Sequence, residues 1–464
     1  MVSRSSETHE DSINTTAPGL LLRLLSAAAG AQVTHGMLSL WIISRAGRIL
    51  SLLTPLVIAR WFGATADTDV VFFVFATALY LASLFGPILE RIIAPYLRQA
   101  RAEGTDTGPF LGHVLGVSSV TIGVALFVAL LIGHPFFNFF TGFDREQVSL
   151  AYRLLLILGP LSMLVVWSSA IAGTLRAYDH QRAAALSPAL SALVTWIATF
   201  ALRDSLGIYA IACGYLLGEL LRLSVLLASL LKSQVCSLAL TLKPDARIRR
   251  FLQDAFYVAV GSAAVGLNPL VDKAMASWLS PGDVSILHYA DALYMIPVVL
   301  LTGRIIVSAY SPWQRRLQER GVERFRRDVE SRLWLIAIFT GVCCLGLLIV
   351  HRPVLWLAMD WGLLTRETAN VVSLVWICYT IGLVPAVMER TLVQAHQVLH
   401  SFPIFMTMGT VNFVLNVMLN LALMRQFGLY GIALSTSCIS TLVTILLWRS
   451  FRKRCAERVR RGDH

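Results

Sequence analysis

A carboxylate and an ammonium group stand side by side in an otherwise apolar stretch of this chain. The segment "NPLVDKAMASWL" contains Asp272 followed directly by Lys273. Neighbouring side chains on a helix point about 100° apart, so these two groups need not pair with each other. Lys273 could reach Glu219 or Asp291, which would leave Asp272 free for another role.

A second apolar segment, "NFVLNVMLN", places amides at every fourth position. Asn412, Asn416 and Asn420 therefore share one helix face, and an unpaired amide in lipid is costly, so this face must look inward. The next apolar segment adds the hydroxyls of residues 435–436. With the carboxylate of Asp272, these oxygens form a set suited to a small cation. A hydrogen-bond network between helices, without a metal, explains the same residues equally well.

Three arginines suggest a different chemistry. Arg45 and Arg48 are three residues apart and share a helix face, and Arg304 lies deep in a later apolar segment. Charges within membrane segments usually face a cavity or a partner, and the planar guanidinium binds phosphate through paired hydrogen bonds. We predict that the three arginines line a pyrophosphate-binding cavity. The alternative is packing against a helix carbonyl or an acidic neighbour such as Asp291.

The composition indicates what must position these side chains. The 464 residues are 56% hydrophobic and 14% charged, and the mean hydropathy is +0.68. Soluble domains carry roughly 25% charged residues, so this chain is predicted to be an all-α polytopic membrane protein. A spanning helix needs about 20 apolar residues. About twelve such segments can be assigned: 36–60, 69–97, 110–133, 149–176, 184–202, 207–231, 253–278, 284–312, 332–350, 368–396, 402–424 and 428–449.

The net charge of +12 is unevenly distributed between the loops. Lys and Arg gather in alternate loops, including the run "RRLQERGVERFRR", whereas the intervening loops are poor in both. Cytoplasmic loops of membrane proteins carry such an excess, so both termini are predicted to be cytoplasmic. Binding of anionic lipid headgroups is a secondary role for these loops, and no nucleic-acid partner is expected.

The chain is internally duplicated at an offset of 217 residues. "ARWFG" aligns with "ASWLS", Gly86 with Gly303, and Pro95 with Pro312. Six segments in each copy would give both copies the same orientation, as two parallel six-helix bundles around a central cavity. Arg45, Arg48, Asp272 and Arg304 have no charged counterpart in the other copy. The predicted organisation is a polar tail with an interfacial helix (1–35), a first bundle (36–232), a cytoplasmic linker (233–252), a second bundle (253–450) and a basic tail (451–464).

Three blocks resemble the MurJ/MviN family of lipid II flippases. They are "ISRAGRILSLLTPLVIARWFGATADTDVVFFVF", "SILHYADALYMIP" and "ERTLVQAHQVLHSFPIFMTMGTVNFVLNVMLNLALMRQFGLYGIALSTS", in the family's order. The family belongs to the multidrug/oligosaccharidyl-lipid/polysaccharide exporter superfamily. The resemblance implies flipping of a polyprenyl-pyrophosphate-linked saccharide across the bacterial inner membrane. Arginines of the family are replaced by Ala82 and Ala292, so an exopolysaccharide or O-antigen unit is an alternative to lipid II.

The resemblance also implies particular site residues. Asp69 matches the family's acidic residue after the "FGA" turn, and Asp291 lies in the "YAD" motif. With Arg45, Arg48 and Arg304, they make up the predicted substrate site. The family's sodium site maps onto the following predicted ligands: Asp272, Asn416, Asn420, Thr436 and the carbonyl of Ile432.

Other functions are less well supported. A cation-coupled multidrug exporter of the same superfamily would have a more acidic and aromatic cavity. A membrane enzyme acting on lipid-linked glycans would need catalytic groups in a long outer loop, and the outer loops 134–148 and 351–367 offer no convincing pair. A scaffold that has lost transport is a third possibility. No nucleotide-binding or zinc-protease motif is present, so we expect a transporter without a cofactor, driven by an ion gradient or the membrane potential. We also expect the protein to be monomeric.

Overall fold

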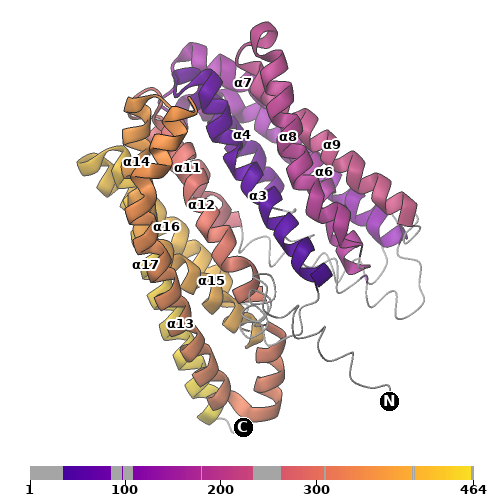
Figure 1. Cartoon of the computed structure of the whole chain (residues 1–464), viewed down its shortest axis with the longest axis vertical. Coiled ribbons are helices and arrows are strands. Elements are labelled where there is room, and N and C mark those ends of the chain that lie inside the picture. The colour runs from indigo at the N-terminus through magenta and orange to yellow at the C-terminus, as the bar shows by residue number, and fades with distance from the viewer. Residues whose placement is uncertain are drawn as a thin grey trace, which may run out of the picture.

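The computed structural model describes residues 35–84, 97, 108–178, 180–233, 263–307, 310–399, 401 and 403–460. Within these residues the regular structure is entirely helical. Figure 1 shows the helices of the first copy on one side of the molecule and those of the second copy on the other. The two sets approach each other at one end, the joined end, and diverge toward the opposite end, the split end (Figure 1).

The N-terminal half contains six helices within the described residues. They are α3 (His35–Phe62), α4 (Ala66–Ser83), α6 (Gly108–Phe140), α7 (Arg145–Ala177), α8 (Gln181–Leu206) and α9 (Tyr209–Ser233). The C-terminal half follows the same plan with seven described helices. They are α11 (Asn268–Ala276), α12 (Asp283–Val307), α13 (Tyr310–Asp360), α14 (Arg366–Ile381), α15 (Leu383–Val398), α16 (Pro403–Phe427) and α17 (Leu429–Arg460).

Every predicted apolar segment overlaps one of these helices. Among the described residues, nine helices are long and apolar enough to cross a membrane, or ten if the bent pair α14 and α15 is counted as one span. The all-helical, multi-pass class predicted from composition is therefore confirmed. The predicted interfacial helix and most of the predicted linker fall on residues 1–34 and 234–252, outside the described part of the chain.

Several helices run past the ends assigned to them from hydropathy. The helix predicted to end at 133 continues to Phe140, and the one predicted to end at 350 continues to Asp360. A helix keeps its backbone groups hydrogen-bonded where hydropathy drops, so polarity alone does not end it. The predicted basic tail is also helical as far as Arg460, because Phe451 and Cys455 are buried against the C-terminal half.

The span predicted at 368–396 is broken in the structure. Helices α14 and α15 meet at Gly382 with a bend of 43°. Pro385 cannot donate a backbone hydrogen bond and clashes with the preceding turn, which favours a kink here. Hydroxyls of α17 satisfy carbonyls around the break: Ser437 Oγ donates to Cys378 O at 2.6 Å and Thr444 Oγ1 to Pro385 O at 2.8 Å. The break is thus stabilised by its neighbour.

Three apolar clusters build the interior of the molecule. One contains residues of both halves, such as Phe72 and Tyr289, and joins them. A second, which includes Leu97 and Leu226, is built by the N-terminal half alone. The third, which includes Phe325 and Phe451, is built by the C-terminal half alone. Each half therefore has an apolar core built only from its own residues, called here its private core, and also contributes residues to the shared cluster.

Equivalent residues of the two repeats touch at the joined end. Ser285 Oγ donates to Thr68 Oγ1 at 2.9 Å, and these residues are 217 positions apart, the offset of the repeat. Contact between equivalent positions is what a two-fold relation between the copies would produce. Tyr289 adds a hydrogen bond of 2.6 Å to the carbonyl of Gly63, in the turn between α3 and α4.

Candidate functional site

A large cavity lies in the N-terminal half. Side chains from α3, α4, α7, α8 and α9 line it, α12 of the other half closes one wall, and its volume is about 530 Å³. Helix α8 packs closely against both α3 and α9, which fixes the positions of the lining residues. Gly47 permits one of these contacts, since a Cβ there would lie 3.2 Å from the backbone nitrogen of Ala189.

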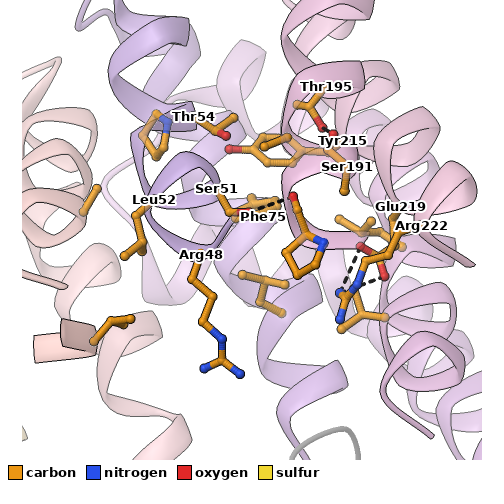
Figure 2. A pocket seen from close by; sticks show the side chains of 18 of the residues that line it. Arg48, Ser51, Leu52, Thr54, Phe75, Ser191, Thr195, Tyr215, Glu219 and Arg222 are labelled. Carbon is orange, nitrogen blue, oxygen red and sulfur yellow. Dashed lines mark hydrogen bonds and ion pairs between the residues drawn. The ribbon is translucent and has the colours of Figure 1, made fainter. Parts of the chain in front are cut away.

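Three arginines from three helices face this cavity. Arg48 extends from α3, Arg176 from α7 and Arg222 from α9. The three charges lie near enough to repel one another. Glu219 provides one compensating charge: its two carboxylate oxygens accept from Arg222 Nη1 at 3.1 and 3.3 Å (Figure 2). Arg48 is exposed to the cavity and makes no hydrogen bond or ion pair within the described residues. A cation cluster of this kind suits a phosphorylated ligand.

Hydroxyl and aromatic side chains also line the cavity, beside aliphatic residues such as Leu52 and Leu79. Ser51 Oγ donates to Pro188 O at 3.1 Å, and Trp196 Nε1 donates to Thr54 Oγ1 at 3.0 Å, so helices α3 and α8 are held together beside the cavity. The ring of Tyr215 packs on that of Phe75 with centroids 4.3 Å apart (Figure 2). Hydroxyls and aromatic faces are groups that can contact a saccharide.

Only part of the predicted substrate site lines this cavity. Arg48 and Asp291 do so. Arg45 lies on the same helix as Arg48 but donates from Nη1 to the Val299 carbonyl at 2.6 Å, so it bridges α3 and α12. Arg304 belongs to α12, and its side chain lies outside the described part.

Asp69 lies at the joined end and not in the cavity. It is buried, with 3% of its surface exposed. Its carboxylate accepts hydrogen bonds from Gly282 N at 2.6 Å, Ser285 N at 2.8 Å and Ser285 Oγ at 2.6 Å. These donors stand at the start of α12, where backbone N–H groups lack helical partners and the helix dipole favours a negative charge. Asp69 therefore connects the two halves.

The residues predicted to bind a cation form one connected network. Asn416 Nδ2 and Asn420 Nδ2 donate to Asp272 Oδ1 at 2.9 and 2.6 Å. Asn420 Oδ1 accepts from Ser435 Oγ, which also donates to the Ile432 carbonyl at 2.8 Å. Thr436 Oγ1 contacts the same carbonyl at 3.4 Å. Sequence reasoning thus grouped these side chains as the fold does.

The donor set fits both interpretations of this network. With the amide nitrogens facing Asp272, it is a satisfied hydrogen-bond network between α11, α16 and α17. The two ends of an amide are interchangeable in position, and turning both amides would present their oxygens with the carboxylate, the hydroxyl of Thr436 and the Ile432 carbonyl. These are the oxygen ligands of a hard cation. Among the described residues, no cluster of three or more His, Cys, Asp and Glu side chains could hold a metal.

The comparisons with known proteins agree on one family. Residues 58–461 match the family model described as "Lipid II flippase MurJ". The chain belongs to the lipid II flippase MurJ family. A relative from Buchnera aphidicola subsp. Acyrthosiphon pisum, named "Probable lipid II flippase MurJ", is 23% identical over 442 residues, which are 92% of this chain and 85% of the relative.

Solved structures support the same fold. A structure titled "Lipid II flippase MurJ, inward closed conformation" has a TM-score of 0.75 at 23% identity, and the match covers 89% of this chain and 87% of that one. A multidrug resistance MATE family transporter of the MOP superfamily, in an inward-facing conformation, has a TM-score of 0.73 at 15% identity, covering 94% and 98%. The MurJ family and the MATE transporters therefore share the architecture of this chain.

Alanine stands at two positions where the resemblance predicted arginine. Ala82 is packed into the private core of the N-terminal half, and Ala292 lines the cavity. The cavity lining contains Arg176 and Arg222, which were not among the site residues predicted from the sequence.

A signal for both missed arginines was present in the repeat. Arg176 aligns with Val393 at the offset of 217. Arg222 aligns with Val443, because the offset between the copies is four residues longer in this region. Both break the internal symmetry, as Arg45 and Arg48 do. A charge that only one copy carries is unlikely to belong to the structure common to both copies, so this asymmetry marks Arg176 and Arg222 as candidate site residues.

Proposed function

We propose that this member of the MurJ family translocates a polyprenyl-diphosphate-linked saccharide across the membrane by alternating access. The observation that carries the proposal is the cavity in which Arg48, Arg176 and Arg222 converge from three helices. Arginine binds phosphate oxygens through paired, charge-assisted hydrogen bonds. The three arginines would hold the diphosphate, and the hydroxyl and aromatic lining would contact the sugar. The polyprenyl chain would remain in the apolar membrane.

Alternating access would exchange which end of the molecule is closed. In the present conformation the halves meet at the joined end, so ligand would enter from the split end. Opening the joined end would break the hydrogen bonds of Asp69 and expose the cavity to the other side. The three arginines could bind the diphosphate in both conformations, because all three belong to the same half.

We infer the orientation from the charge of the split end. The first part of α13 lies there and carries exposed residues such as Arg315 and Arg327 (Figure 1). The excess of Lys and Arg favours the cytoplasmic side. In a cysteine-free background, Arg320→Cys should resist an impermeant thiol reagent in intact cells and react after the membrane is permeabilised. Labelling in intact cells would contradict this orientation.

A reconstituted flipping assay tests the transport proposal. Full-length protein in proteoliposomes should move fluorescent lipid II or a fluorescent undecaprenyl-diphosphate-linked oligosaccharide between leaflets, and protein-free vesicles should not. Comparing the two lipids decides between a cell-wall and an exopolysaccharide precursor. Transport of a cationic drug with neither lipid moved would instead favour the multidrug exporter, and this would contradict the proposal.

We also propose that the network around Asp272 holds a sodium ion. An ion that binds only the folded state raises the melting temperature by mass action. Sodium should therefore stabilise the wild type more than potassium at equal ionic strength, since screening responds to both salts alike. The difference should shrink in Asn416→Ala and Thr436→Ala, and vanish in Asp272→Asn. Equal effects of the two salts on the wild type would show that Asp272 is not a selective sodium ligand.

A further inference from the structure

The ion pair on α9 uses only part of its arginine. Glu219 and Arg222 are three residues apart, so they lie on one face of the helix, and both line the cavity. Both hydrogen bonds to Glu219 come from one nitrogen, Nη1 of Arg222. Nε of Arg222 is buried and has no hydrogen-bond partner within the described residues. A guanidinium has five N–H donors, so much of the binding capacity of Arg222 is left for another anion.

The charges around this pair also favour a second anion. Arg48 and Arg176 reach the same cavity from α3 and α7, and their charges and that of Arg222 repel one another. Glu219 pairs with Arg222 of this cluster and is 7% exposed. The described cavity lining contains three arginines and two acidic side chains, Glu219 and Asp291, so positive charge is in excess. A diphosphate carries more charge and more acceptor oxygens than Glu219 and could contact several arginines at once.

The backbone beside Glu219 is held rigidly. A Cβ at the neighbouring Gly218 would lie 2.6 Å from the carbonyl oxygen of Ser191 on α8, so only glycine allows this approach. Gly214 makes a similar contact one turn earlier, where a Cβ would lie 2.9 Å from the carbonyl oxygen of Thr195. Because the backbone of α9 is fixed against α8, the pair can separate only by rotation of the Glu219 and Arg222 side chains.

We propose that Glu219 is an exchangeable counter-ion within the substrate site. The diphosphate of an incoming lipid would displace Glu219 from Arg222 and bind Arg48, Arg176 and Arg222 together. The return of Glu219 to Arg222 would then assist release on the other side of the membrane. This inference rests on the proposed function, and it assigns binding to Arg176 and Arg222 and a positioning role to Glu219. A purely structural pair would only stabilise α9.

Binding of undecaprenyl diphosphate to the purified full-length protein distinguishes the two roles. Glu219→Gln removes the competing charge and keeps the shape, so the Kd should fall at least about threefold, the scale of a partly exposed ion pair. At saturating lipid concentration, flipping should slow, because no carboxylate at position 219 competes with the diphosphate for Arg222 and release is therefore slower. Glu219→Asp, which shortens the reach of the carboxylate, should give a smaller tightening. Misfolding cannot produce tighter binding, so the result does not depend on equal stability of the variants.

A double-mutant cycle provides the control. Arg222→Gln should weaken binding, and adding Glu219→Gln to that variant should change nothing further, because the competition no longer exists. Glu389→Gln removes a carboxylate next to Arg390 in the other half, outside the cavity lining, and should leave the Kd unchanged. Unchanged or weaker binding by Glu219→Gln would overturn this inference and leave the proposed function standing. If the wild type itself fails to bind undecaprenyl diphosphate, the proposed function falls as well.

Discussion

The joined end and the split end hold the two halves in different ways. At the joined end, Asp69 of one half accepts hydrogen bonds from Gly282 and Ser285 of the other, beside an apolar cluster to which both halves contribute. Toward the split end, each half completes its own apolar cluster. The halves can therefore separate at the split end without exposing a shared core. A transporter that opens at alternate ends needs this difference to be reversible.

The hydrogen bonds at the joined end, unlike the shared apolar cluster, can be broken at moderate cost. A carboxylate and backbone N–H groups that lose one another can bond to water, so the net cost of each hydrogen bond is about 1.5–3 kcal/mol and not its full strength. Separating an apolar interface has no such compensation. The turn at Gly282 requires a positive φ of 96°, and a Cβ there would lie 2.9 Å from the carbonyl oxygen of Ala64. Close approach of the two turns thus depends on glycine.

Locking the joined end should produce the largest effect. In a cysteine-free background, Thr68→Cys with Ser285→Cys replaces two hydroxyls that are 2.9 Å apart, so a disulfide can form with little movement. Oxidation should abolish flipping completely, and reduction should restore it. Each single variant should flip with or without oxidant. Full flipping by the oxidised double variant would show that the joined end need not open.

The next largest effect should come from the cavity. Arg48→Ala removes a cation that lines the cavity and has no ion-pair partner among the described residues. Losing a charge that binds the substrate costs about 2–5 kcal/mol, or at least about thirtyfold in flipping. The melting temperature should stay near that of the wild type, since no internal partner is lost. Arg48→Lys should recover only part of the rate, because lysine lacks the planar fork. Normal flipping by Arg48→Ala would remove this residue from the site.

A smaller effect is expected on the stability of the joined end. Asp69→Asn keeps the size of the side chain but removes the charge and one acceptor, which should cost about 1.5 kcal/mol of unfolding free energy. Asp283→Asn is the matched control, because within the described part of the chain Asp283 accepts a hydrogen bond from Ser280 N of its own half, at 2.9 Å, and none from the other half. Thermal unfolding should show a greater loss for Asp69→Asn. Equal losses of unfolding free energy would mean that the hydrogen bonds of Asp69 between the halves add no stability beyond that of a bond within one half.

The smallest effect should occur on the surface of the split end. Arg315 and Glu319 form an exposed pair at 2.6 Å, one turn apart on α13. Solvent competes for such a pair and salt screens it, so Arg315→Ala should leave the melting temperature unchanged. Flipping should also stay at the wild-type level. A clear loss of stability would show that the split end depends on more than the two private cores.

The helical class and the span pattern followed from the sequence because they depend on local properties. Twenty apolar residues in a row must bond their own backbone in lipid, wherever the rest of the chain lies. The grouping of Asp272, Asn416 and Asn420 also came from a local rule, since an unpaired amide in lipid must find a partner on another helix. The family resemblance then indicated which helix that partner belonged to.

Only the tertiary structure determined where each charged side chain lies and what it contacts. Asp69 and Asp291 are both acidic residues in apolar helices, yet one joins the halves and the other lines the cavity. Arg222 pairs with Glu219 on its own helix, and the packing of α9 against α8 and α7 places this pair in the cavity lining. The helices that pack around a charged side chain come from segments remote in sequence, so only the folded arrangement determines whether that side chain joins the halves or lines the cavity.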